Sequence, residues 1–139
     1  MTHPRFVLDA SVAVAWCFED ENSAAADAVL NQMAKAEAVV PAIWRVEVAS
    51  ALLAGERRTR GKPAETALAL DLLGSLNIRV DEDALPEWEQ LIGLARSEKL
   101  SVYDAVYLSL AIRKGLALAT LDAGLKRAAR SVGVKLVAG

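Results

Sequence analysis

The sequence holds little of what disulfide or membrane stabilisation requires. Its 139 residues include one cysteine, Cys17, so no disulfide can form within the chain, and a lone thiol suits a reducing cytosol. No apolar run reaches the roughly 18 residues that a membrane helix needs, because the best candidate, residues 6–18, is interrupted by Asp9. We therefore expect a cytoplasmic protein with no membrane span.

Imidazole is equally scarce, since His3 is the only histidine. His3 lies in an N-terminus that we expect to be frayed, and Cys17 is expected to pack in the core of the first helix. Zinc sites are built mainly from cysteine and histidine, so a zinc centre is not expected.

The chain does have enough apolar sequence for a core. Hydrophobic residues make up 54% of it, and charged residues, spread along the whole length, make up 24%. This composition is typical of a compact globular domain, and the length is close to the commonest size for one. We predict a single domain over residues 1–139.

The charge balance argues mildly against nucleic-acid binding, because the net charge is −2. Basic residues nevertheless gather in two segments, which are Arg57, Arg58, Arg60 and Lys62, and then Lys126, Arg127 and Arg130. The charge pattern alone favours solvated helix ends or faces for both. Without the acidic residues discussed below, the remaining surface would be clearly more basic.

Short apolar strands alternate with helical patterns, without a linker or repeat. The expected strands are residues 6–8, 38–40, 78–80, 116–120 and 134–137. The expected helices cover residues 11–18, 22 or 23 to 36, 43–58, 63–73, 84–98, 101–115 and 122–130. This order predicts a three-layer α/β/α fold around a central, mostly parallel five-stranded sheet.

Two carboxylates follow predicted strands. Asp9 ends the first strand, and Asp122 lies just beyond the fourth. Ligands of open parallel sheets bind beyond the carboxyl ends of the strands, which favours a shared site. The alternative is that each residue only caps the helix after it.

Glu47 and Asp104 are candidates on helices. Glu47 lies nearly opposite Arg45 and Glu56 on a helical projection, among mainly apolar neighbours, where a carboxylate needs a partner or a cation. Its alternative is an exposed glutamate on a helix that is apolar nearly all round. Asp104 follows Ser101 by three positions, so a capping box is an alternative to metal binding.

The four carboxylates lie in blocks that together resemble the PIN domain family, over residues 6 to about 136. The blocks are Leu8-Asp9-Ala10-Ser11, Trp44-Arg45-Val46-Glu47-Val48, Tyr103-Asp104-Ala105-Val106-Tyr107 and Thr120-Leu121-Asp122. The surroundings of the last three are typical of VapC-type toxins. One departure is Ala123-Gly124, where basic residues often follow, and it leaves the contribution of this loop to substrate binding open.

The resemblance implies a nuclease that hydrolyses RNA phosphodiester bonds with Mg²⁺ or Mn²⁺. Asp9, Glu47 and Asp104 would hold the metal directly or through water, and Asp122 would complete the acidic pocket as a further ligand. Clustered carboxylates need a cation or protons, and oxygen-only ligands select a hard ion. The hydroxyl groups of Ser11 and Thr120 would orient the carboxylates or water, and the alternative is that they are turn and cap hydroxyls.

The resemblance also implies partners. VapC-type toxins pair with a VapB-type antitoxin, whose C-terminal segment covers the active site, and they form homodimers and, with the antitoxin, heterotetramers or larger assemblies. Trp16, Trp44 and Trp88 could serve such an interface, but large aromatics favour a core role for each.

Three other functions compete with this interpretation. A phosphatase of the haloacid-dehalogenase type needs a second aspartate two positions after the first, where this chain has Ser11. A receiver domain needs partners that the segment 81–83 lacks. The remaining competitor is a catalytically silent PIN-like module that binds RNA or a protein, and the presence of all four acidic residues argues against it.

Overall fold

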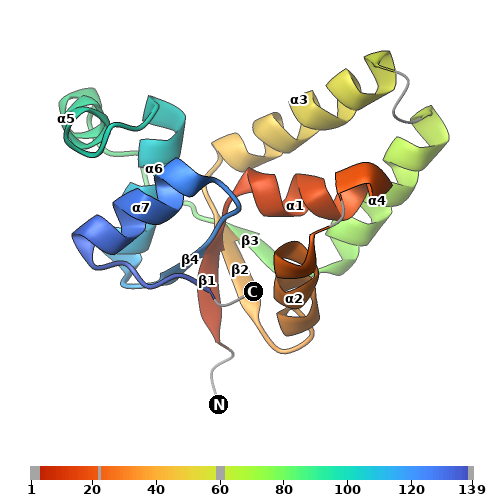
Figure 1. Ribbon diagram of the computed structural model, residues 1–139, viewed down its shortest axis with the longest axis horizontal. Helices are drawn as coiled ribbons and strands as arrows, with labels where there is room; N and C mark the ends of the chain where they lie inside the picture. The colour runs from red at the N-terminus through yellow and green to blue at the C-terminus, as the bar shows by residue number, and fades with distance from the viewer. Residues whose placement is uncertain (1–3, 22, 59–61, 138–139) are drawn as a thin grey trace.

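The computed structural model describes residues 4–21, 23–58 and 62–137. Within these residues a parallel four-stranded sheet has the order β3-β2-β1-β4, which places β1 in its interior (Figure 1). The strands are β1 (Arg5–Leu8), β2 (Glu37–Val40), β3 (Ile78–Val80) and β4 (Ala117–Ala119). His3 lies outside the described residues.

Helices lie on both faces of this sheet. They are α1 (Ala10–Cys17), η1 (Glu19–Glu21), α2 (Ala24–Gln32), α3 (Ile43–Arg57), α4 (Pro63–Ser75), α5 (Trp88–Glu98), α6 (Val102–Lys114) and α7 (Ala123–Val132). Figure 1 shows α1 to α4 on one side of the strands and α5 to α7 on the other. The chain runs outward from β1 to β3 and returns to add β4 beyond β1, so right-handed crossovers place the two helix groups on opposite faces. The three-layer prediction is confirmed.

The predicted fifth strand is reduced to a single parallel bridge between Leu118 and Leu136. The Leu118 amide donates to the Lys135 carbonyl, and the Val137 amide donates to the Leu118 carbonyl, each with a donor–acceptor distance of 2.9 Å. Alternate residues of a strand turn their backbone groups to opposite neighbours, so the three-residue β4 offers only Leu118 to this segment. The described part of the sheet therefore has one strand fewer than predicted.

The start of α5 also differs from the prediction. Residues 84–87 were expected to be helical, but α5 begins at Trp88. Pro86 disfavours helical backbone at the residue before it, which explains the later start. Trp88 is 73% exposed, so the expected core role is wrong for it, whereas Trp44 is buried and Trp16 is half-buried.

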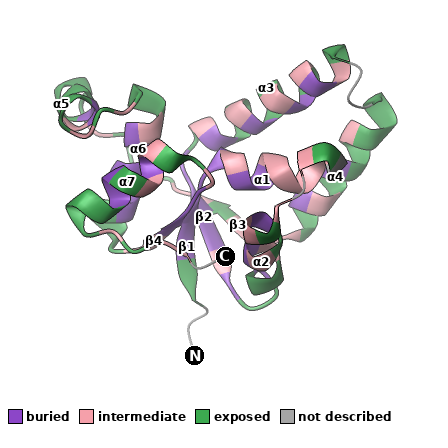
Figure 2. Cartoon of the chain, in the orientation of Figure 1, coloured by how far each residue is buried: buried purple, intermediate pink, exposed green. Residues whose placement is uncertain are grey.

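The core lies against β1 and α6. Phe6, Val7 and Leu8 are at most 3% exposed, and α6 is buried continuously from Ala105 to Ala111 (Figure 2). A strand covered on both faces must be apolar at every position, which is why β1 does not alternate. Asp9 follows directly and so begins deep in the protein. None of the helices in the described part is long and apolar enough to span a membrane.

Candidate active site

Asp9 lies at the carboxyl end of β1 and is only 5% exposed. It occupies the N-cap position of α1, but its side chain makes no capping hydrogen bond. The Oδ2 atom instead accepts hydrogen bonds from Ser11 Oγ at 2.6 Å and from Thr120 Oγ1 at 2.7 Å. The side chain is therefore not used as a helix cap.

Ser11 and Thr120 connect this carboxylate to the loop that follows β4. Ser11 Oγ accepts a hydrogen bond from the Leu121 amide, and Thr120 Oγ1 accepts one from the Asp122 amide, both with a donor–acceptor distance of 3.0 Å. Each hydroxyl thus donates to Asp9 and accepts from the loop, which fixes the ends of β1 and β4 relative to each other. Turn and cap roles alone do not account for these contacts.

The pKa of Asp9 is raised above its usual value. Burial is the main cause, the hydrogen bonds from Ser11 and Thr120 lower it, and the negative charge of Asp122 raises it. Desolvation disfavours the charged form and outweighs the two hydroxyl donors. The ionised carboxylate would be stabilised by a nearby cation.

Glu47 projects from α3 and is half-buried. Its Oε1 atom accepts a hydrogen bond of 2.5 Å from the hydroxyl of Tyr107, a fully buried residue of α6. Burial raises the pKa of Glu47, the Tyr107 hydrogen bond lowers it, and the charge of Asp9 raises it. The alternative of an exposed glutamate is wrong, because Glu47 is half-buried.

Asp104 lies in the first turn of α6, whose N-cap Ser101 accepts a hydrogen bond from the Asp104 amide at 3.1 Å. Burial raises the pKa of the Asp104 carboxyl to about 6, followed by the charges of Asp9, Asp122 and Glu47. The effect of a charge on a pKa falls off with distance, so the three carboxylates that act on Asp104 lie in its neighbourhood. The fold therefore brings carboxylates from distant parts of the sequence, between positions 9 and 122, into one region.

Asp122 caps a helix and also acts electrostatically on the other carboxylates. Its Oδ2 atom accepts a hydrogen bond from the Leu125 amide at 2.8 Å, so it caps α7. Its charge also raises the pKa of Asp9 and of Asp104. Capping therefore does not remove Asp122 from the group that we call the acidic cluster, which consists of Asp9, Glu47, Asp104 and Asp122.

Tyr107 is the site residue that sequence reasoning did not single out. It is three positions after Asp104 on α6, and a buried tyrosine hydroxyl needs a hydrogen-bond partner. That requirement was the available signal, but it could not identify Glu47, which is 60 positions away. Burial raises the pKa of Tyr107, so the hydroxyl keeps its proton and acts as the donor.

Replacing Tyr107 with phenylalanine is expected to raise the pKa of Glu47 further and to lower the free energy of unfolding by about 1–2 kcal/mol. The hydroxyl is the donor that favours the charged form of Glu47, and its loss leaves a half-buried acceptor without a partner. A carboxyl-carbon NMR titration and urea unfolding would measure the two effects. Tyr103→Phe is the matched control, because Tyr103 is 62% exposed. Equal effects of both substitutions would contradict the role given to Tyr107.

The donor chemistry of the acidic cluster fits a hard divalent cation. Every member offers carboxylate oxygens, and their mutual repulsion is what a cation would relieve. Within the described residues, no three histidine, cysteine, aspartate or glutamate side chains are arranged as a ready metal site. Mg²⁺ commonly binds through one or two carboxylates and keeps several waters, so it does not need such a group.

Cys17 takes no part in this site. Its thiol donates to the Ala13 carbonyl at 3.2 Å within α1, and burial raises its pKa to about 11. A thiol that stays protonated is a poor metal ligand and a poor nucleophile.

Comparison with known proteins identifies the family. The sequence pattern of the PIN domain matches residues 6–131, and the chain belongs to the PIN domain family. Among curated proteins, none matches the sequence.

Solved structures share the fold. PAE2754 from Pyrobaculum aerophilum has a TM-score of 0.68 and 24% identity, over 91% of this chain and 87% of that one. VapBC2 from Rickettsia felis, bound to a DNA fragment from its promoter, has a TM-score of 0.64 and 16% identity, over 96% and 97% of the chains. A toxin–antitoxin complex from Klebsiella pneumoniae has a TM-score of 0.56 and 17% identity, over 84% and 86%.

Proposed function

We propose that the protein is a divalent-metal-dependent endoribonuclease that acts as the toxin of a toxin–antitoxin pair. The observation that carries the proposal is that Asp9 is buried at the carboxyl end of β1 and that the charges of Asp9, Glu47 and Asp122 all act on Asp104. PIN domains are generally nucleases, which gives this cluster a chemical purpose. Structural stability does not explain it, because clustered carboxylates repel one another.

The acidic cluster would hold Mg²⁺ or Mn²⁺ through its carboxylate oxygens. A bound ion of this kind lowers the pKa of a water molecule and stabilises the charge that develops on the phosphate during in-line attack. The surrounding hydroxyl groups orient the ligands: Ser11 and Thr120 fix Asp9, and Tyr107 fixes Glu47. Such orienting groups hold carboxylates in place before substrate binds.

A groove beside Glu47 supports a protein inhibitor as the partner. It lies between α1 and α3, has a volume of about 570 Å³, and includes Val46 and Tyr103, which are 70% and 62% exposed. Large exposed apolar side chains mark interaction surfaces. We propose that a VapB-type antitoxin covers the site here, that the toxin forms homodimers and, with antitoxin, heterotetramers or larger complexes, and that it acts in the cytoplasm.

The test is cleavage of total RNA by the purified protein, freed of any bound partner, in the presence of Mg²⁺ or Mn²⁺. We expect discrete fragments that disappear when EDTA removes the metal and when Asp9 is replaced by asparagine. Asp71→Asn, which changes the same charge at an exposed position of α4, should cleave like the wild type.

Folded, metal-loaded protein that leaves RNA intact in both wild type and Asp9→Asn would overturn the proposal. Binding of RNA or of a protein without cleavage would then favour the silent PIN-like module. Fragments that persist in Asp9→Asn would instead indicate a contaminating ribonuclease, and catalysis would lose its support.

A further inference from the structure

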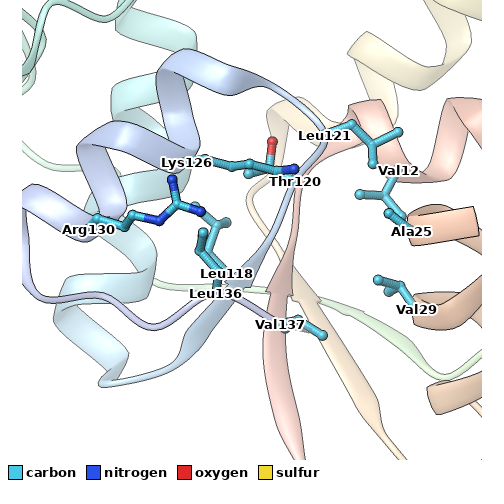
Figure 3. A pocket seen from close by; sticks show the side chains of 10 residues that line it. All are labelled: Val12, Ala25, Val29, Leu118, Thr120, Leu121, Lys126, Arg130, Leu136 and Val137. Atoms are coloured by element: carbon cyan, nitrogen blue, oxygen red, sulfur yellow. The ribbon is translucent and has the colours of Figure 1, made fainter. Parts of the chain in front are cut away.

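A second pocket opens at the β4 edge of the sheet, next to the Asp9 network (Figure 3). Its volume is about 240 Å³. Lys126 and Arg130 of α7 extend toward it from one side, and Val12 of α1 and Val29 of α2 face it from the other. Thr120, which donates to Asp9, is part of the lining. We call this the Lys126–Arg130 pocket.

The two cations of this pocket form no ion pair with another residue that the structure describes. Lys126 and Arg130 are four positions apart on α7, so their side chains share one face of the helix and repel each other. No ion pair or side-chain hydrogen bond is formed by either with any described residue. Arg127 differs, because it donates to the Glu98 carbonyl at 3.2 Å. Two unbalanced cations that face a pocket favour an anionic ligand.

The sequence pattern had favoured a solvated helix face for all three basic residues. That interpretation suits Arg127, which is exposed and lies outside the pocket lining; Arg130 is exposed as well but lines the pocket, and Lys126 is half-buried against it. Lysine commonly lays its methylene groups along apolar surface and keeps its ammonium group at the water boundary. Its position therefore places a positive charge at the rim of a cavity whose other lining residues, apart from Arg130 and Thr120, are apolar.

The remaining walls are apolar. Leu118 of β4 and Leu136 of the C-terminal segment join Val12 and Val29 around the cavity. A ligand for such a pocket needs an anionic group for the cations and an uncharged part for the aliphatic side chains. A ribose-phosphate unit has both.

The shared Thr120 connects this pocket to the acidic cluster. An RNA strand that presents a phosphate to that cluster meets four carboxylates on a chain of net charge −2. Positive charge close by is needed to bind a polyanion there, and Lys126 and Arg130 supply it on the Asp122 side of the site. An acidic peptide would neutralise the two cations, but it would not explain why Thr120, which donates to Asp9, lines the same pocket.

We propose that the Lys126–Arg130 pocket binds a phosphate and its ribose in the RNA strand adjacent to the phosphodiester bond that is cleaved. The proposal rests on the proposed function, since it takes the acidic cluster as the place of cleavage. Binding of the RNA strand is thereby assigned to the face of α7 that carries Lys126 and Arg130. The segment immediately after Asp122 lacks basic residues, so the positive charge comes from further along the helix.

The test is RNA binding by Lys126→Gln/Arg130→Gln. The probe is a fluorescein-labelled single-stranded RNA of random sequence, measured by anisotropy in an Asp9→Asn background so that it stays intact. We expect binding to weaken about tenfold or more at low salt, and the salt dependence to become less steep by about 0.7 for each lost phosphate contact. In the catalytically intact background, KM should rise about tenfold while kcat changes less than about threefold.

The matched control is Lys35→Gln/Arg79→Gln, which removes the same charge at two exposed positions away from the pocket. It should change RNA binding less than about twofold. Lys126→Arg/Arg130→Lys keeps both charges and should bind nearly as the parent does, which separates charge from packing. Thermal unfolding would show that each variant is folded.

Equal RNA binding by the pocket variant and the control would overturn the inference, even if the wild type cleaves RNA. Loss of antitoxin binding with RNA binding unchanged would overturn it as well, in favour of an acidic peptide as the ligand. Absence of cleavage alone tests the proposed function and not the pocket, because the binding assay does not depend on cleavage. In that case, weaker RNA binding by the pocket variant would still support the RNA assignment.

Discussion

Replacing Asp104 with asparagine is expected to reduce RNA cleavage at least about 100-fold and, at the same time, to make the metal-free protein more stable. Activity falls because one carboxylate that would hold the metal is lost. Stability rises because the charged carboxylate is disfavoured: burial, followed by the charges of Asp9, Asp122 and Glu47, raises the pKa of Asp104 to about 6. Cleavage assays with Mg²⁺ and urea unfolding in EDTA would measure the two effects.

The sign of the pH dependence follows from the raised pKa. The folded protein holds the Asp104 proton up to about pH 6, whereas the ordinary carboxyl loses it near 3.8. The free energy of unfolding should therefore fall as pH rises between these two values and stay level above them, as far as Asp104 contributes. The gain from Asp104→Asn should be about 1–2 kcal/mol above pH 6, after allowance for solvent screening, and should vanish below pH 4.

Asp27→Asn is the control for this experiment, because Asp27 is exposed in the first turn of α2. It should leave cleavage unchanged and should not increase stability, since an acidic residue near a helix N-terminus is favourable. Mg²⁺ should stabilise the wild type more than Asp104→Asn. If Asp104→Asn lost stability in EDTA at pH 8, the carboxylate would be a structural partner and not a member of a repelling cluster.

Replacing Leu8 with alanine is expected to cost about 2–5 kcal/mol of unfolding free energy. Leu8 is fully buried in β1, which lies between β2 and β4 and beneath α6, so its truncation leaves a cavity that neighbouring elements cannot close easily. The total free energy of unfolding of a domain of this size is about 5–15 kcal/mol, and the midpoint of thermal unfolding should fall by about 10–20 °C. Calorimetry and urea unfolding would measure the change.

Leu68→Ala is the matched control, because the same truncation is made on α4 at a side chain that is 68% exposed. Its effect should stay within about 0.5 kcal/mol. A loss below about 1 kcal/mol for Leu8→Ala would show that β1 tolerates a cavity, contrary to the packing described above. At low temperature the folded fraction of Leu8→Ala should still bind RNA, since Leu8 lines neither the Lys126–Arg130 pocket nor the groove beside Glu47.

Much of the fold could be predicted from local patterns. Short, mainly apolar segments indicated β1 to β4, and the alternation with helices indicated a parallel sheet between two helix layers. The errors occurred where a local pattern competed with a neighbour. Residues 134–137 have a strand-like composition, but the short β4 offers them one bridge, and Pro86 delays the start of α5 until Trp88. Exposure of Trp88 could not be predicted from its type.

The candidate site divides in the same way. Asp9 and Asp122 could be placed from the sequence because each follows a buried strand, and parallel strands bring their carboxyl ends to one edge. Glu47 could be singled out from its apolar neighbours on the helix, but the placement of Glu47 and Asp104 in one site came from the family resemblance, because nothing local to α3 or α6 indicates that the two helices face the same edge. Sequence patterns also could not show that Ser11 and Thr120 both donate to Asp9.

The sequence by itself determined the family, the layered parallel fold and the residue types available for chemistry, with oxygen ligands abundant and thiol and imidazole nearly absent. These properties depend on composition and on neighbours within a few residues. Only the tertiary structure decided that Tyr107 donates to Glu47 and that Lys126 and Arg130 face a pocket beside Thr120. The physical reason is that strand order and helix packing bring distant segments together, and the burial and charge of each side chain follow from those contacts.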